Sequence, residues 1–112
     1  MTLDEFLAHN AAIAPQSAQL DVRGFAYLFV RRWQRGFLGK TSDVLTLVYM
    51  EAAPTGQGTF KALVAHLREQ RPQLILLIES VTSPRFQDGL RRLGFVEFTS
   101  WPGPSFYLPA LS

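Results

Sequence analysis

Residues 45–67, LTLVYMEAAPTGQGTFKALVAHL, decide the fold of this chain. The first seven are rich in apolar residues, which predicts a buried strand. Gly56 and Gly58 follow, and they leave backbone N–H groups uncovered at the positive end of a helix dipole. Such a turn holds a phosphate or pyrophosphate without a cationic side chain. The residues after Gly58 predict an amphipathic helix, because their apolar members recur at i, i+3, i+4 and i+7. These residues are Phe60, Leu63, Val64 and Leu67.

The residues before this stretch predict a helix, a linker and a β-hairpin. Thr2 and Glu5 have capping-box spacing, so we expect a helix that ends near Pro15. A β-rich segment then predicts a strand, and a glycine-containing loop joins it to the strand of the central stretch. The expected segments are a helix over residues 3–13, a linker over 15–21, strands over 25–33 and 44–50, and a loop over 35–42.

The residues after the central stretch predict a strand, a helix and two further strands. Residues 74–78, LILLI, show no alternation, which is typical of a strand covered on both faces. Ser83 suits an N-cap, Pro84 suits the first helical position, and Gly94 suits the residue just after the helix. The helix is expected to have an inner stripe of Phe86, Leu90 and Leu93 and an i, i+4 ion pair of Asp88 with Arg92, followed by strands over residues 95–101 and 105–108.

Together these elements predict an α/β fold with a mixed, centrally parallel sheet flanked by helices. The strand–helix–strand unit over residues 44–81 is expected to be a right-handed parallel crossover. The hairpins on either side of this unit add antiparallel strands. A chain of 112 residues is expected to form a single domain over residues 1–112.

Composition narrows the classes of function. The absence of cysteine excludes disulfides and thiolate metal sites, and it fits a reducing compartment. Asp4 and Glu5 stand where a signal peptide would carry a basic segment, and no apolar run reaches the roughly 18 residues of a membrane helix. We therefore expect a cytoplasmic protein without membrane contact. His9 and His66 lie far apart in the sequence, so no metal site is expected.

Residues 31–35, RRWQR, form one local cluster of cations in a chain whose net charge is only +2. An aromatic ring among cations is compatible with RNA or phosphate binding. The cluster is equally compatible with a solvated strand end whose arginine stems lie over apolar surface. No recognisable nucleic-acid motif accompanies it, which favours the second interpretation.

Two blocks of sequence resemble the GNAT superfamily of N-acetyltransferases, over about residues 22–108. Residues 56–60, GQGTF, follow a strand and resemble the family's acyl-CoA pyrophosphate loop. That loop has Gln or Arg, two variable residues, Gly, one variable residue, and Gly or Ala. Residues 83–95 resemble the family's second block, with Phe86, Leu90 and the Gly94–Phe95 pair at its spacing.

The resemblance implies acetyl-CoA as co-substrate and a small-molecule or protein amine as acceptor. It places the backbone of the strand before the loop, from Val48 to Ala52, along the pantetheine arm. Glu51 is the candidate base, and Tyr49, two residues earlier on the same face, is a substitute acid. The remaining residues implied to bind the cofactor are Val48, Met50, Ala52, Gly56, Gln57, Gly58, Thr59, Phe60 and Ser83.

The sequence departs from the family pattern at several positions. Thr55 stands at the Gln or Arg position, and Phe60 replaces the small residue that closes the loop. The Phe60 ring either covers the turn or packs inward with its helix. Leu90 stands where many members have a tyrosine that protonates the leaving thiolate, and Ser83 where asparagine is common. The segment before residue 21 offers one helix, where family members have a strand and two helices.

These departures keep a second hypothesis open, a catalytically silent GNAT-like fold that serves as a structural or protein-interaction module. A protein partner or a second copy of the chain is compatible with it. The other polar residues are given structural roles. Glu79 is predicted to form an ion pair within an apolar strand, Glu97 to face solvent, and His66 to be exposed.

Overall fold

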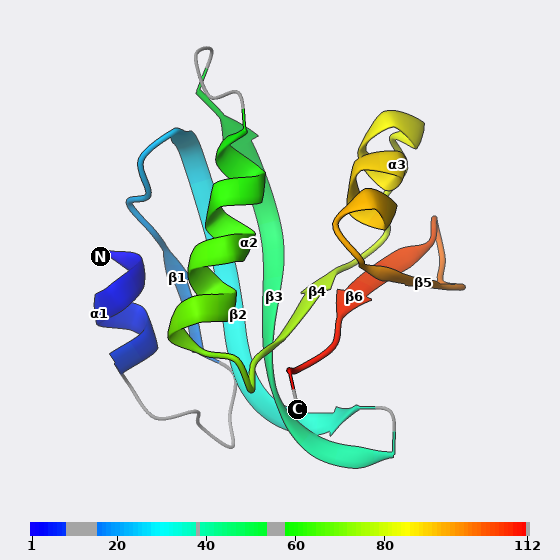
Figure 1. Ribbon diagram of the computed structural model, residues 1–112, viewed down its shortest axis with the longest axis horizontal. Coiled ribbons are helices and arrows are strands. Elements are labelled where there is room, and N and C mark those ends of the chain that lie inside the picture. The colour runs from blue at the N-terminus through cyan, green and yellow to red at the C-terminus, as the bar shows by residue number, and fades with distance from the viewer. Residues whose placement is uncertain (9–15, 38, 54–57, 112) are drawn as a thin grey trace.

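The strands form one mixed sheet in the order β1-β2-β3-β4-β6-β5 (Figure 1). The computed structural model describes residues 1–8, 16–37, 39–53 and 58–111. β3 and β4 pair in parallel, and the other neighbouring strands pair antiparallel. The predicted mixed, centrally parallel α/β sheet is therefore confirmed. The strand bounds are β1 Gln16–Gln19, β2 Phe25–Phe37, β3 Lys40–Ala52, β4 Ile75–Ile78, β5 Val96–Phe98 and β6 Ser105–Leu108.

All three helices of the described chain pack on one face of this sheet. Their bounds are α1 Leu3–Ala8, α2 Thr59–Gln70 and α3 Pro84–Arg92. Leu63, Val64 and Leu67 of α2 are buried, as their spacing predicts, and they join alternate residues of the sheet. Burying this stripe is the main force that holds α2 on the sheet. The shared core cluster also contains Phe6 and Leu7 of α1, Leu28 and Val30 of β2, Leu45 and Leu47 of β3, Leu90 of α3 and Phe106 of β6.

The opposite face of the sheet carries a second, smaller core. Val44, Ile75 and Leu77 are buried there. The end of the β2–β3 hairpin curves beneath the sheet (Figure 1), and Phe37 at this end packs on Tyr107 with ring centroids 5.3 Å apart. Within the described residues, no helix contributes to this second cluster. This second core is therefore covered by aromatic side chains of the hairpin, β5 and β6, namely Phe37, Phe98 and Tyr107.

Two predicted segments before the central stretch are corrected. The predicted linker over 15–21 is wrong where it is described, because residues 16–19 form β1, which pairs with β2, with Ala18 opposite Val30. Residues 35–42 are not a loop, because β2 runs to Phe37 and β3 begins at Lys40. Neither segment has a sequence of high β-propensity, so strand pairing decides both. The N-terminal helix ends at Ala8 within the described residues, and residues 9–15, with His9, lie outside them.

The predicted boundaries of α3 are confirmed. The Ser83 hydroxyl accepts a hydrogen bond from the Phe86 N–H at 3.3 Å, and Pro84 begins the helix. Gly94 has a φ of 92°, and the Gly94 and Phe95 N–H groups donate to the carbonyls of Arg91 and Leu90. These two bonds are a Schellman motif, which closes the helix end. β4 is also confirmed, since all four of its residues are buried.

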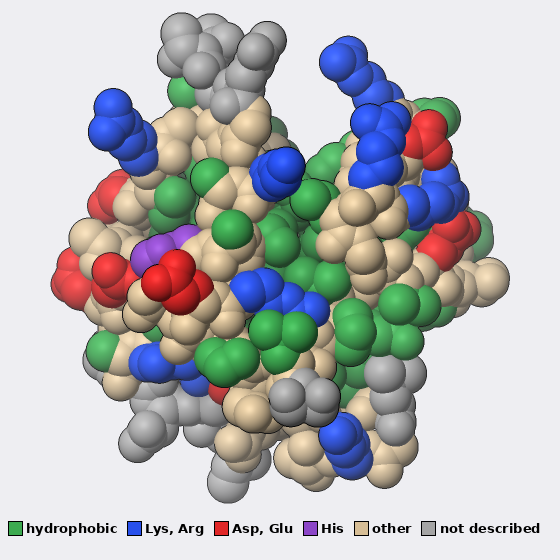
Figure 2. All heavy atoms as spheres, in the orientation of Figure 1, with side chains coloured by type: hydrophobic (Ala, Val, Ile, Leu, Met, Phe, Trp, Pro, Cys, Tyr) green, Lys and Arg blue, Asp and Glu red, His purple; other side chains and the backbone are tan. Residues whose placement is uncertain are grey.

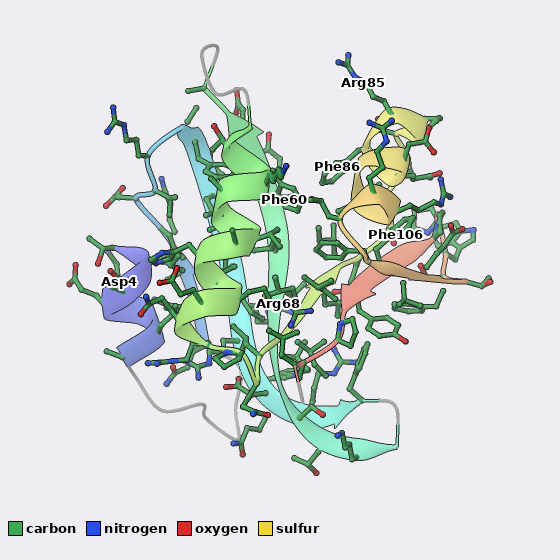
Figure 3. The ribbon with its side chains drawn as sticks, viewed as in Figure 1. Asp4, Phe60, Arg68, Arg85, Phe86 and Phe106 are labelled. Atoms are coloured by element: carbon green, nitrogen blue, oxygen red, sulfur yellow. The ribbon has the colours of Figure 1, made fainter. Side chains whose placement is uncertain are left out.

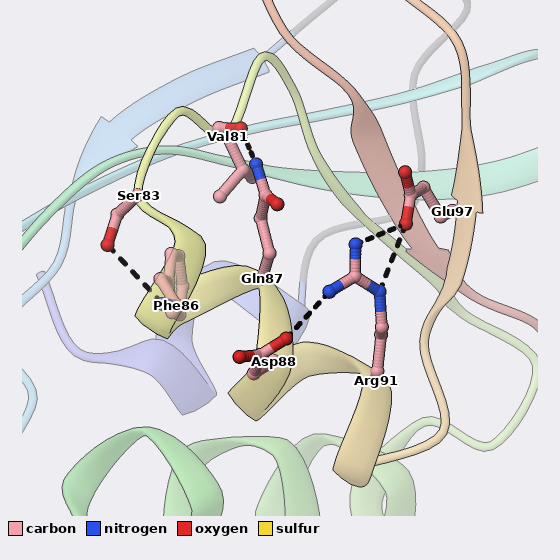
Figure 4. A network of polar contacts seen from close by, with 7 residues as sticks. All are labelled: Val81, Ser83, Phe86, Gln87, Asp88, Arg91 and Glu97. Atoms are coloured by element: carbon pink, nitrogen blue, oxygen red, sulfur yellow. Dashed lines mark hydrogen bonds and ion pairs between the residues drawn. The ribbon is translucent and has the colours of Figure 1, made fainter.

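Two predicted ion pairs are wrong. Asp88 binds Arg91 at 2.8 Å instead of Arg92 (Figure 4). Arg91 lies over β5, where Glu97 binds it at 2.6 Å, so one guanidinium joins both carboxylates. Glu97 is exposed, as predicted. Glu79 is exposed and forms no ion pair with any described residue, because β4 ends one residue earlier at Ile78.

The His66 side chain is 42% exposed, as the sequence predicted. Its Nε2 atom lies 3.2 Å from Oδ1 of Asp4, which joins α2 to α1. The described segments contain no group of three or more potential metal ligands. None of their helices is long and apolar enough to cross a membrane.

Candidate active site

The start of α2 is open to solvent at Gly58. Gly58 is the N-cap of the helix in a left-handed conformation, with a φ of 73°, and has no side-chain cap. A Cβ atom at Gly58 would meet no atom of a described residue within 4 Å. The first N–H groups of a helix have no intrahelical acceptor, so they remain available to an anion here. Gly56 and Gln57, the rest of the predicted loop, lie outside the described residues.

A hollow of about 790 Å³ extends from Gly58 between α2 and α3. Lys61 on the first turn of α2 lines one side, and Arg85 and Arg92 of α3 line the other. Figure 2 shows Lys and Arg side chains on both sides of a hollow, with apolar side chains between them. Ser83 also lines the hollow, although its hydroxyl accepts a hydrogen bond as the α3 N-cap. The hollow is therefore electropositive with an apolar floor.

The Phe60 ring packs inward, toward α3, and leaves Gly58 clear (Figure 3). Its centroid lies 5.4 Å from the Phe86 ring in an edge-to-face contact, and 6.2 Å from the Phe95 ring. The ring is half-buried and lines the hollow. This contact leaves Gly58 accessible, so Phe60 does not shield the start of α2 at Gly58. The rest of the predicted loop lies outside the described residues.

The end of β3 carries a bulge. Phe29 pairs with Tyr49 and the next residue of β2 with Leu47, so Val48 is an extra residue in the ladder. Bulges of this kind are frequent beside active sites. Val48 is exposed, whereas Met50 is half-buried against the main core on the helix side. The backbone of Ala52 pairs with β2 opposite Phe25.

Tyr49 and Glu51 lie on the same face of the sheet, as predicted. Their cross-strand partners are Phe29 and Tyr27, two residues apart on β2. This face is opposite to the one that carries the helices. On β2, Leu28 and Val30 alternate with Tyr27 and Phe29 and enter the helix-side core, so Tyr27 and Phe29 point the other way. The structure thus places the candidate acid and base across the sheet from the hollow.

The pairing of β3 with β4 ends at Thr46 and Leu77, while β3 continues to Ala52. The bulge at Val48 and the Tyr49–Glu51 pair lie beyond this last pairing. In this region the backbone groups on the β4 side of β3 have no strand partner from β4. Backbone of this kind is able to pair with an extended ligand.

The sequence analysis missed three residues of the hollow, Lys61, Arg85 and Arg92. Arg85 and Arg92 are seven residues apart and therefore lie on one side of α3. That spacing was visible in the sequence. Nothing in the sequence showed that α3 would turn this side toward the first turn of α2, because the two helices are separated by β4.

A tight contact also holds the start of α2 against the β1–β2 turn. Gly24 in this turn has a φ of 93°, and a Cβ atom there would lie 2.6 Å from both Cγ2 and Oγ1 of Thr59. On the same side, a second hollow of about 600 Å³ lies between the turn, α1 and α2. Thr59 thus faces the turn and this second hollow.

Replacing Gly24 with alanine is expected to lower the free energy of unfolding by about 2 kcal/mol, through backbone strain and the clash with Thr59. Gly39→Ala is the matched control, because Gly39 has a φ of 84° but its Cβ position meets no atom of a described residue within 4 Å. It is expected to show only the strain, roughly 1 kcal/mol. Urea denaturation measures both, and equal losses would contradict the steric contact.

This architecture is found among solved structures, but no protein-family model and no curated protein sequence matches the chain. Among solved structures, a mutant form of the AtaT toxin matches with a TM-score of 0.55 and 18% sequence identity. That structure contains the C-terminus of the antitoxin AtaR and acetyl-CoA. The chain has a GNAT-like fold.

The match covers 75% of this chain and 57% of the AtaT chain. A second AtaT structure, bound to the AtaR C-terminus alone, matches with a TM-score of 0.56 at the same identity and coverage. The chain therefore spans little more than half the length of the toxin. At this identity the comparison establishes the GNAT-like fold, and the chemistry depends on this chain's own residues.

Proposed function

We propose that this protein binds acetyl-CoA in the hollow between α2 and α3 and transfers the acetyl group to an amine. The observation that carries the proposal is the open, uncapped start of α2 at Gly58 beside three cationic side chains. A helix N-terminus and convergent cations together favour a polyphosphorylated ligand. The GNAT-like fold and the acetyl-CoA in the AtaT structure support this choice of ligand.

The residues present fit the cofactor. The space above Gly58 accepts a group where a Cβ would stand, and Lys61, Arg85 and Arg92 offset phosphate charge. The apolar rings of Phe60 and Phe86 line the hollow and suit an uncharged arm. The β4 side of the β3 backbone beyond Thr46, which β4 does not pair, supplies hydrogen bonds along it. When bound, acetyl-CoA supplies a thioester as the acyl donor.

Two side chains are proposed to act on protons. Glu51 accepts a proton from the acceptor's ammonium group, directly or through water, so that the free amine attacks the carbonyl. The thioester is proposed to reach this face between β3 and β4, beyond their last pairing at Thr46 and Leu77. Tyr49, exposed two residues earlier on the same face as Glu51, would there donate a proton to the leaving thiolate. The Tyr49 hydroxyl would take the role of the tyrosine that many GNAT enzymes carry at the position of Leu90, which lies in α3 here. The products are the acetylated amine and free CoA.

Acetyl-CoA is expected to raise the melting temperature, because a ligand at about 100 times its Kd adds roughly 2.7 kcal/mol to the free energy of unfolding. Reversing two charges in Lys61→Glu/Arg92→Glu is expected to weaken binding at least about tenfold, as measured by calorimetry. Lys40→Glu, an exposed change at the far end of the β2–β3 hairpin, is the matched control and keeps full affinity.

Gly58→Trp tests the same site sterically. An indole group at this position occupies the open space above the α2 N-terminus and is expected to abolish binding. A wild-type protein that shows neither a melting shift nor calorimetric heat with acetyl-CoA would refute the proposal.

A second function is favoured by one observation. Leu90 stands where many GNAT enzymes have the proton-donating tyrosine, and it is fully buried in the main core. Phe60 takes part of the space between the helices. A catalytically silent GNAT-like domain that binds a protein partner is consistent with this. The AtaT structures contain a bound antitoxin segment, which supports a protein partner for such a fold. Acetyl-CoA binding without turnover on any amine would favour this function.

A further inference from the structure

Three aromatic side chains form a shallow cup on the face of the sheet opposite the helices. Tyr27, Phe29 and Tyr49 line a hollow of about 380 Å³. The Tyr27 and Tyr49 rings meet edge to face at 5.2 Å with an interplanar angle of 77°. Tyr49 keeps 55% of its surface exposed. An exposed ring beside two half-buried ones makes a contiguous apolar surface with a hollow, and such surfaces mark interaction or ligand-binding sites.

A single carboxylate stands at one end of this cup. Glu51 lies directly across from Tyr27 in the β2–β3 ladder, so the two side chains share the face and are neighbours. Glu51 is exposed and forms no ion pair with another described residue. Its negative charge is therefore available to a ligand in the cup.

The other end of the cup carries the opposite charge. Arg31 lies on the same face of β2, four residues beyond Tyr27, and is exposed. Four residues of strand span about 13 Å. The cup is thus polar along its length, with an anion at the Glu51 end, rings in the middle and a cation at the Arg31 end.

We propose that this cup binds the acceptor, a monoamine with an apolar body, as its ammonium ion. The inference rests on the proposed function, since it assigns the substrate class of the same site. Aromatic faces attract an ammonium group, and Glu51 adds a charge-assisted hydrogen bond. The apolar body lies over Phe29 and Tyr49. The ammonium is then already at the group that accepts its proton.

The polarity of the cup selects among amines. A diamine that spans the cup brings its second ammonium toward Arg31, where like charges repel. A neutral or anionic far end is favoured there. The cup therefore discriminates against extended polyamines and in favour of compounds with one cationic end.

The test is calorimetric titration of the full chain without acetyl-CoA, with phenethylammonium as the probe. Its uncharged analogue, 2-phenylethanol, is expected to bind about fivefold or more weakly, because it lacks the cation. A long-chain diamine is expected to bind more weakly than phenethylammonium as well. Equal affinities for the ammonium and the alcohol would overturn the proposal.

Variants locate the binding site. Glu51→Gln is expected to remove the preference for the ammonium over the alcohol. Tyr49→Ser is expected to weaken both probes by about fivefold, and because Tyr49 is exposed the substitution leaves the core intact. Val96→Ala, an exposed apolar residue on β5, is the matched control and leaves both affinities unchanged. Unchanged affinities in Tyr49→Ser would place the probe elsewhere and overturn the assignment.

The outcome is separable from that of the proposed function. Acetyl-CoA binding is measured alone, on the other face of the sheet, and the amine titration contains no acetyl-CoA. Loss of acetyl-CoA binding with retained ammonium selectivity would refute the acetyltransferase and keep the cup as a binding site. Retained acetyl-CoA binding with no ammonium selectivity would refute the cup alone. If the wild-type protein formed a dimer that Tyr49→Ser did not form, a second copy of the chain would occupy the cup, and the proposal for the amine would also be refuted.

Discussion

Replacing Arg32 with alanine is expected to lower the free energy of unfolding by about 3 kcal/mol. The Arg32 side chain is 7% exposed and binds Asp43 through two bonds, Nε to Oδ1 at 3.0 Å and Nη2 to Oδ2 at 2.7 Å. Its Nη1 also donates to the Leu7 carbonyl at 3.3 Å. Alanine leaves a partly buried carboxylate without its cation, and α1 loses one of its connections to the sheet.

Arg31→Ala is the matched control, because the neighbouring side chain is exposed on the opposite face. It is expected to change the free energy of unfolding by less than about 0.5 kcal/mol. Both variants are compared by urea denaturation, with the denaturant slope checked for two-state behaviour. A loss below about 1 kcal/mol in Arg32→Ala would show that the pair contributes no more than a surface ion pair. Arg32→Lys is expected to recover only part of the loss, since an ammonium cannot form the two parallel bonds.

Replacing Glu51 with glutamine is expected to lower kcat by roughly a hundredfold on an accepted amine. Glutamine keeps the size of the side chain but cannot take the proton from the ammonium. The affinity for acetyl-CoA, measured by calorimetry, is expected to stay unchanged, because the hollow lies on the other face of the sheet. The KM for the amine is expected to rise, since the same carboxylate holds the ammonium.

Glu79→Gln is the matched control, an exposed carboxylate just after β4 with no ion pair to a described residue. It is expected to leave kcat and KM unchanged. Tyr49→Phe removes only the hydroxyl and is expected to lower kcat with little change in amine binding, because the ring remains. Unaltered turnover in Glu51→Gln would remove Glu51 from the mechanism.

The helical part of the fold was predictable from the sequence because its signals are local. The stripe of α2 from Leu63 to Leu67 and the caps of α3 at Ser83 and Gly94 depend on residues within one or two turns of each other. β4 was predictable for the same reason, since an unbroken apolar run cannot face solvent. These elements appear where expected, to within a residue or two.

The edges of the sheet were not predictable, because strand pairing is not a local property. β1 reads QSAQ, which has no strand pattern of its own, and only its ladder with β2 makes it a strand. The turn region around Lys40 looks like a loop, yet the hairpin continues through it. Arg91 binds both Asp88 and Glu97 because β5 returns beside α3. The i, i+4 rule describes isolated helices and takes no account of a neighbouring strand.

The candidate site likewise has features that local sequence determines and features that tertiary packing determines. The sequence alone determined that a strand passes through glycine into a helix, with Glu51 and Tyr49 on one face of that strand, because alternation and helical period act over a few residues. Only the tertiary structure decided that Phe60 turns toward Phe86 and leaves Gly58 open. It alone brought Lys61 opposite the arginines of α3, and Tyr27 beside Glu51. These neighbours are set by helix packing and strand register, which join residues that are distant in the chain.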